Sequence, residues 1–278
     1  MCEGADTENR KIFRILELSL GFNGTFAARP VVFQKSKIFR HYKIFTMCYT
    51  LYYAPDNASL IIRIALLELG LPFETKLFDR TINQQKSENY LKLNPNKLIP
   101  VLHTDALFIS ETRAILLWLS DGHRALAVAF IDIIRAELLK WLFWISNTLH
   151  PALRILFYPH HYTTGETKLQ REVVGKQKRT LVSHLYLINR ALECEASSRK
   201  KNNLNMVHIY LAVCLRWMAL YPLDETSWFC LNSWPTWLKL CQTLELRQSA
   251  LEAALCEGLG EAVYSNPTLP DPPEGVPF

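Results

Sequence analysis

The feature that most constrains this chain is a change of pattern near residue 121. Short runs of β-branched and aromatic residues, which are typical of strands, occur between Tyr49 and Ile109. After Asp121 the chain consists of long segments with the spacing of helices. This switch predicts a small α/β domain followed by an all-α domain, rather than one uniform fold.

The α/β domain is expected to have the order βαβ-α-ββα over residues 47–121. Strands are predicted at 49–53, 73–78, 99–103 and 106–109, and helices at 59–69 and 110–120, with a further helical segment between 80 and 92. Two strand–helix elements this close in the chain indicate a parallel pair of strands. Only Thr104-Asp105 separate the last two strands, which favours an antiparallel hairpin.

The all-α domain is predicted over residues 122–260. Its helices are expected at 125–149, 166–195, 205–220, 235–244 and 248–257, and Asn205 is expected to cap the third of them. Residues 261–278 follow as a proline-rich tail, because five prolines lie within 265–278. Such a tail is expected to pack on the surface or to stay loose.

Residues 1–46 show no sustained periodicity and carry eight Lys and Arg against four acids. They are expected to be a disordered extension or the product of a wrongly chosen start codon, because Met47 stands at the edge of the patterned sequence. A targeting peptide is the alternative, although Glu3, Asp6 and Glu8 argue against a mitochondrial one. The remaining chain has 23 basic and 22 acidic residues, so nothing there indicates nucleic-acid binding.

Composition excludes two further classes. Every run without a charged side chain is well short of the roughly 20 apolar residues that a bilayer-spanning helix needs. The seven cysteines are scattered and form no Cys-x-x-Cys pair, so neither a disulfide framework nor a zinc ribbon is expected. Scattered cysteines without a disulfide pattern indicate a reducing compartment, and we expect a cytoplasmic protein.

Several segments of the α/β half resemble the glutathione-binding domain of soluble glutathione S-transferases of the bacterial type. They are Leu51-Tyr52-Tyr53-Ala54-Pro55-Asp56-Asn57-Ala58-Ser59-Leu60, Glu68-Leu69-Gly70-Leu71-Pro72-Phe73-Glu74, Tyr90-Leu91 with Leu93-Asn94-Pro95, Ile99-Pro100-Val101-Leu102 and Glu111-Thr112-Arg113-Ala114-Ile115. The segments 247–250 and 254–259 resemble the last helices of bacterial members. The resemblance covers about residues 48–260 and implies a thioredoxin-like first domain, glutathione as co-substrate and a homodimer.

Glutathione presents two carboxylates, an amine and a thiol, and its site needs a device for each part. Ile99-Pro100 resembles the family's residue before a cis-proline, whose N–H and C=O pair with the tripeptide as a strand does. A trans proline at the start of an edge strand is the plain alternative. We expect the cis form, given the Asn94-Pro95 turn upstream together with the family resemblance.

The γ-glutamyl end of the tripeptide is assigned to the start of the helix at 110–120. Ser110 is expected to cap this helix, so that its first N–H groups and its dipole attract a carboxylate. Thr112 offers an N–H and a hydroxyl to the same carboxylate, and Glu111 receives the ammonium group. An ordinary capped helix with an acid in its first turn would look the same in sequence.

The thiol needs a hydrogen-bond donor that stabilises its ionised form. Ser59 is the first candidate because it opens the first helix, and Tyr53 at the end of the first strand is the second. Related bacterial enzymes carry a cysteine in the segment matched by 56–59, whereas Ala58 stands here before the matched serine. This departure removes the thiol for mixed-disulfide chemistry and leaves conjugation possible.

The resemblance therefore implies a glutathione S-transferase that attacks a small hydrophobic electrophile with the glutathione thiolate. An aromatic region would face this second substrate, although such a stripe is more often core. It consists of Trp141, Phe143, Trp144, His150, Tyr158 and Tyr162. No metal is expected, because His160-His161 lack further ligands at suitable spacing. A catalytically weak glutathione- or ligand-binding protein of the same fold, and a glutathione-dependent isomerase or peroxidase, stay open as alternatives.

Overall fold

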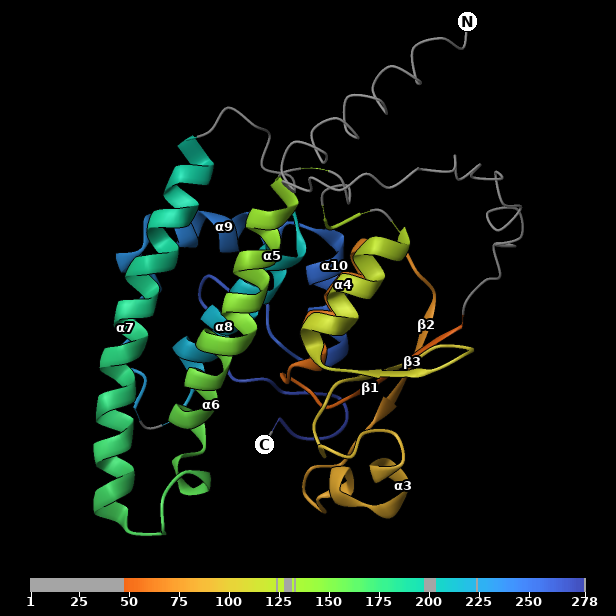
Figure 1. Cartoon of the computed structure of the whole chain (residues 1–278), viewed down its shortest axis with the longest axis horizontal. Helices are drawn as coiled ribbons and strands as arrows, with labels where there is room; N and C mark the ends of the chain where they lie inside the picture. Colours follow the sequence, from red (N-terminus) through yellow and green to blue (C-terminus); the bar gives the residue numbers. More distant parts are fainter. Residues whose placement is uncertain are drawn as a thin grey trace, which may run out of the picture. The chain divides into compact units, whose positions relative to one another are not determined.

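The computed structural model describes residues 48–123, 125–127, 132, 134–197, 204–223 and 225–277. The predictions for residues 1–46 lie outside this part of the chain. The described part combines a four-stranded sheet and its helices with a following all-helical region (Figure 1). The predicted fold class, a thioredoxin-like α/β part followed by an all-α part, is confirmed.

The sheet has the order β2-β1-β3-β4. β1 (Tyr49–Tyr53) pairs in parallel with β2 (Phe73–Leu77), and α2 (Ser59–Glu68) connects them. β3 (Val101–His103) pairs antiparallel with β1 and forms a hairpin with β4 (Phe108–Ser110). The predicted parallel pair and hairpin are both confirmed, with strand ends shifted by one or two residues.

The alternation of side chains along β1 separates the two faces of the sheet. Tyr49, Leu51 and Tyr53 join the main core under α2 and α4 (Thr112–His123). Tyr52 packs on the opposite face in a small cluster with Tyr90, which belongs to α3 (Glu88–Leu91). Figure 1 shows α3 beyond one end of the sheet, far from α4.

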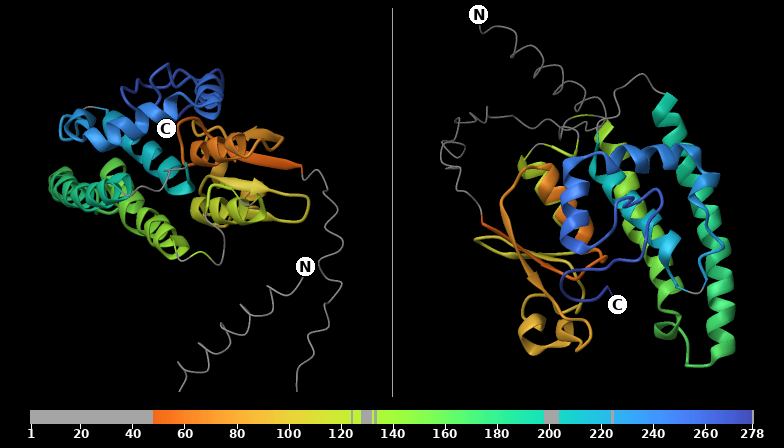
Figure 2. Two further views of the ribbon diagram at one scale, coloured as in Figure 1. Left: turned by 90° about the horizontal axis from the view of Figure 1, so that it is seen from above. Right: turned by 180° about the vertical axis from the view of Figure 1, so that it is seen from behind.

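The helical region is built around α8 (Met206–Leu220), in which nearly every residue is buried. The side chain of Asn205 caps this helix and accepts hydrogen bonds from the N–H groups of Val207 and His208 at 2.9 and 3.1 Å, as predicted. Around it lie α5 (Ile134–Trp144), α6 (His150–Phe157), α7 (Thr167–Ser197), α9 (Pro235–Glu245) and α10 (Gln248–Glu257) (Figure 2).

The single helix predicted at 125–149 is wrong in its limits. α5 begins at Ile134, and the helical path continues through a π-helical turn, Ile145–Leu149, into α6. Pro151 lies at the start of α6 and has no N–H for the carbonyl one turn earlier, so the ordinary helical hydrogen-bond pattern is interrupted here. The wider π turn accommodates the proline without ending the helix.

The proline-rich tail crosses back to the sheet. The hydroxyl of Tyr53 donates to Glu274, and Gly275 lies against Leu77 and Pro55, where a Cβ atom would come within 2.7 Å of Leu77. The tail is therefore packed, which is one of the two predicted outcomes. None of the helices in the described part of the chain is both long and apolar enough to cross a membrane.

Candidate functional site

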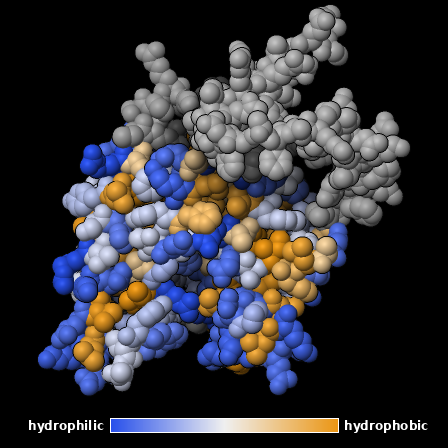
Figure 3. All heavy atoms as spheres, in the orientation of Figure 1, coloured by the Kyte–Doolittle hydropathy of each residue, from blue (hydrophilic) through white to orange (hydrophobic). Residues whose placement is uncertain are grey.

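A cavity of about 600 Å³ lies between the α/β part and the helical region. One wall consists of the turn before α2, the segment before β3 and the start of α4, and the other consists of residues of α6 and α8. The space-filling view shows the molecule hollowed between the end of α6 and α3 (Figure 3). This volume is within the range of small-molecule sites.

Four of the predicted residues meet in the α/β wall: Ile99, Pro100, Glu111 and Thr112 all line the cavity. The Ile99–Pro100 peptide bond is cis, as predicted. The preceding loop is held in place at the Leu98 carbonyl, which accepts hydrogen bonds of 2.7 Å from the Tyr90 hydroxyl and the Asn94 amide.

The start of α4 differs from the prediction in one residue. Ser110 is the last residue of β4 and does not cap the helix. Glu111 takes the cap position instead, since its carbonyl accepts the first helical hydrogen bond, from the Ile115 N–H at 3.0 Å. Its φ of 72° lies in the left-handed region, which is costly for glutamate and is found mostly where a site requires it. Thr112, the first residue of α4, is buried beside it.

Ser59 and Tyr53, the predicted thiol activators, are not in the cavity wall. The Ser59 hydroxyl is fully buried, donates to the Ala54 carbonyl at 3.0 Å and accepts from the Ala54 N–H at 3.3 Å. The Tyr53 hydroxyl donates to Glu274, and burial together with this carboxylate raises the pKa of Tyr53. Both hydroxyls are therefore bonded to protein groups and do not line the cavity.

The residues next to Ser59 line the cavity in its place. Asp56, Asn57 and Ala58, which form the turn between β1 and α2, all contribute to the wall. In the sequence, Asp56 and Asn57 indicate only a turn after the first strand. The available signal was their position between a strand and a helix N-terminus, where polar groups commonly face a ligand.

Asp56 fixes this turn to the helical region through buried contacts. Its carboxylate accepts hydrogen bonds from Arg216 at 2.9 and 3.2 Å, from the Trp217 indole at 3.1 Å and from the Tyr221 hydroxyl at 2.9 Å. Its N–H donates to the buried carboxylate of Glu257 at 2.9 Å. These contacts hold Asn57 and Ala58 at the cavity.

The comparisons with known proteins agree with this geometry. Residues 47–121 match the family model described as the glutathione S-transferase N-terminal domain. Glutathione S-transferase GST-4.5 of Xanthomonas campestris pv. campestris is 29% identical over 190 residues, which cover 66% of this chain and 89% of that protein. These matches support membership of the soluble glutathione S-transferase family. The chain's similarity to Escherichia coli GstB, 36% over 97 residues, spans only 45% of that protein.

A solved structure supports the same assignment for the fold. A sphingomonad glutathione S-transferase, determined in complex with glutathione, superposes with a TM-score of 0.62 at 26% identity. The match covers 76% of this chain and the whole of that one. Both the α/β part and the helical region of this chain therefore have counterparts in that glutathione S-transferase structure.

The helical wall brings aromatic and basic groups to the site. His150, Tyr158 and Tyr162, predicted to face a second substrate, line the cavity, whereas Trp141, Phe143 and Trp144 do not. His150 Nδ1 lies 2.6 Å from the Tyr210 hydroxyl, and burial, with a smaller contribution from Arg154, lowers the pKa of His150 to about 4. This histidine is therefore uncharged at neutral pH.

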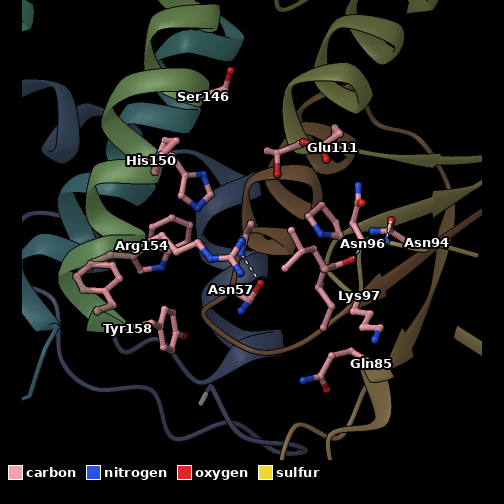
Figure 4. A pocket seen from close by; sticks show the side chains of 18 of the residues that line it. Asn57, Gln85, Asn94, Asn96, Lys97, Glu111, Ser146, His150, Arg154 and Tyr158 are labelled. Carbon is pink, nitrogen blue, oxygen red and sulfur yellow. Dashed lines mark hydrogen bonds between the residues drawn. The ribbon is translucent and has the colours of Figure 1, made fainter. Parts of the chain in front are cut away.

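Arg113 connects the two walls at the start of α4. Its guanidinium donates to Ser146 at 3.0 Å and to Asn147, and it lies 4.7 Å above the ring of Phe143. Arg113 thus joins the α/β part to the π-helical turn and is occupied by protein groups. Figure 4 shows Glu111, Asn96 and Lys97 on one side of the cavity and His150, Arg154 and Tyr158 on the other.

Proposed function

We propose that this chain is a glutathione transferase that conjugates the glutathione thiolate to an electrophile with an apolar body. One observation carries the proposal. Glu111, Thr112 and Ile99-Pro100 lie together in one wall of a single cavity, opposite an aromatic wall. Glu111 supplies an acceptor, Thr112 a donor and Ile99 a strand-like backbone. The family resemblance implies that a γ-glutamyl tripeptide requires these three groups.

In this proposal each part of glutathione has its own partner. The ammonium group binds Glu111, and the γ-glutamyl carboxylate binds the Thr112 hydroxyl and the N-terminal N–H groups of α4, where the helix dipole adds to the attraction. The cysteinyl backbone pairs with Ile99. Lys97, an exposed cation in the cavity wall, faces the glycyl carboxylate.

The thiol would then lie at the turn before α2. The sequence assigns its activation to Ser59, with Tyr53 as the alternative, and the geometry favours a different group. Asn57 is in the cavity wall, and its side-chain amide can donate a hydrogen bond to a thiolate, whereas the Ser59 hydroxyl is bonded to Ala54. We propose that Asn57, at the N-terminal end of α2, stabilises the thiolate.

The reaction is a nucleophilic attack by this thiolate. The sulfur forms a bond to an electrophilic carbon, and a leaving group departs with its electron pair, or the pair moves onto an activated double bond that is then protonated. The protein stabilises the ionised sulfur of glutathione and gives both reactants a fixed position. On the same family resemblance we propose a cytoplasmic homodimer, with domains at 47–121 and 122–260.

We expect Glu111→Gln to weaken glutathione binding about 10- to 100-fold, because it removes one charge-assisted hydrogen bond to the ammonium group. Calorimetric titration of glutathione into the full chain measures this effect. Glu88→Gln, at an exposed glutamate outside the cavity wall, is the matched control and should bind normally. Equal affinity of Glu111→Gln and the unmodified protein would contradict the placement of the γ-glutamyl end.

We expect Asn57→Ala to raise the thiol pKa of bound glutathione by about one to two units, since one hydrogen bond to the thiolate is lost. Ultraviolet absorbance of the thiolate, followed against pH in the saturated complex, measures this pKa. Ser59→Ala is the decisive comparison and should leave the thiol pKa unchanged. The opposite pattern, in which Ser59→Ala raises the thiol pKa and Asn57→Ala leaves it unchanged, would support the assignment made from sequence.

Formation of a thioether product from glutathione and a chlorodinitrobenzene, followed by absorbance, tests the proposed activity. We expect the unmodified protein to turn over faster than the uncatalysed reaction. We expect Asn57→Ala to reduce this turnover. Binding of glutathione without any turnover would instead favour the binding-protein alternative.

A further inference from the structure

The charged side chains of the cavity are unevenly matched. Those in the wall are the acids Asp56 and Glu111 and the cations Arg80, Lys86, Lys97, Arg113 and Arg154. Asp56 is already bonded to Arg216, and Arg113 is occupied as described above. The Arg80 guanidinium donates to the Pro277 carbonyl at 2.5 Å and to the Tyr158 hydroxyl at 3.3 Å. Among the acids of the cavity wall, Glu111 therefore remains as a counter-charge for Lys86, Lys97 and Arg154.

Arg154 stands out among these cations. It lies on α6, one turn after His150, and is partly buried. Figure 4 shows its side chain reaching from α6 across the cavity toward Asn57. Within the described residues its guanidinium makes no ion pair and no hydrogen bond. A partly desolvated guanidinium in a binding cavity is the arrangement that recognises a carboxylate, usually through two parallel hydrogen bonds.

The surroundings of Arg154 strengthen this reading. His150 cannot compete for an anion, because burial keeps it neutral at pH 7. Burial, together with the neighbouring His160, Arg154 and Lys86, lowers the pKa of His161 on the same side of the cavity. Among the described residues, no acidic side chain is a cause of either shift, in agreement with the absence of a carboxylate partner for Arg154 in this part of the chain.

The proposed position of glutathione leaves this positive charge to the second substrate. The tripeptide's groups are assigned to the α/β wall, at Glu111, Thr112, Ile99 and Lys97, whereas Arg154 comes from the opposite, helical wall. We propose that the electrophile carries a carboxylate, which Arg154 binds, while Phe157 and Tyr158 contact its apolar body. This inference rests on the proposed function and names the substrate class of the same site.

Two electrophiles that share the same aromatic ring and differ in one substituent test the inference. One is a chlorodinitrobenzene that carries a carboxylate, and the other is the matched carboxamide, which is neutral. In both, the sulfur–carbon bond forms as chloride leaves with its electron pair. We expect Arg154→Met to lower kcat/KM for the carboxylate about 10- to 100-fold relative to the carboxamide, because a charge-assisted contact is lost. Arg154→Lys should lie between the two.

The controls separate the possible roles of Arg154. Lys140→Met, which removes an exposed cation on α5 outside the cavity wall, should leave the ratio unchanged. The KM for glutathione and the thiol pKa should be unchanged in Arg154→Met. Equal losses with both electrophiles, accompanied by a raised thiol pKa, would overturn the inference in favour of thiolate stabilisation. A raised KM for glutathione with an unchanged ratio would overturn it in favour of tripeptide binding.

A binding measurement keeps this test independent of turnover. Dinitrobenzoate, which has no leaving group, is titrated calorimetrically into the glutathione-saturated protein and into Arg154→Met. Loss of binding in the variant supports the inference even if neither electrophile is converted, an outcome that would contradict the proposed activity alone. Equal binding to both proteins would overturn the inference and leave the proposed activity standing.

Discussion

Replacing Arg216 by methionine is expected to lower the free energy of unfolding by about 3–5 kcal/mol. Arg216 has no exposed surface, and it pairs with Asp56 in the turn before α2. It also donates to the carbonyls of Val263 at 2.9 Å and Thr268 at 3.0 Å in the C-terminal segment. Methionine fills similar space but leaves the Asp56 carboxylate without its cation and two carbonyls without donors. Urea unfolding followed by circular dichroism measures the loss.

The control for this prediction is an ion pair of the same kind at the surface. Lys140 pairs with Glu137 on α5, and both side chains are more than half exposed. Lys140→Met should therefore change stability by no more than about 0.5 kcal/mol. A double variant, Asp56→Asn with Arg216→Met, should lose less than the sum of the two single changes, because the buried charge disappears with its partner. A loss for Arg216→Met as small as for Lys140→Met would contradict the role given to this pair.

The elements that could be predicted from sequence are those set by local patterns. The limits of the strand at 49–53 and the helix at 59–69 agree with the prediction within one residue. A run of β-type residues, helical spacing and a following Gly70 each depend only on neighbouring residues. The hairpin at Thr104-Asp105 was found for the same reason. The cap at Asn205 needed only a polar side chain before an apolar helix.

What could not be predicted depends on contacts between distant parts of the chain. Asp56 and Arg216 are 160 residues apart, and Tyr53 and Glu274 are 221 apart. Nothing in the local sequence indicates that these side chains meet. The direction of the Ser59 hydroxyl is a similar case, because its position at the start of α2 is compatible with facing either the cavity or Ala54.

The resemblance supplied a further part of the site that local patterns do not contain. Glu111 and Thr112 look like an ordinary first turn of a helix, and only the family pattern assigned them to glutathione. The structure adds that both lie in one cavity and that Glu111 has a left-handed conformation. Arg154 was not assigned at all, because a lone arginine on a helix is solvated by default.

The second large effect concerns pH and Glu257, which has no exposed surface. Burial raises the pKa of Glu257 to about 7, although Arg63 beside it and the N–H of Asp56 favour its ionised form. An unfolded chain has the ordinary glutamate pKa, so between about pH 4.5 and 7 the folded protein binds more protons than the unfolded one. Glu257 therefore lowers stability as pH rises through this range, by up to about 3 kcal/mol.

Glu257→Gln isolates this contribution, because glutamine does not titrate. We expect the stability of the variant, relative to the unmodified protein, to increase by up to about 3 kcal/mol between pH 4.5 and 8. His150, whose lowered pKa makes stability rise with pH, is present in both proteins and cancels in the difference. The pH dependence of the 2.7 Å contact to Arg63 is already contained in the pKa of Glu257, since arginine stays charged throughout and only the carboxyl titrates.

Urea unfolding at several pH values measures this difference, with Glu252→Gln, an exposed position on the same helix, as the control. A difference between Glu257→Gln and the unmodified protein that stays constant with pH would show that Arg63 and Asp56 keep Glu257 ionised in the folded state. A difference that falls as pH rises would mean that these two partners outweigh burial. An increasing difference means that burial dominates, and that the contact holding the turn before α2 weakens as this carboxyl becomes protonated.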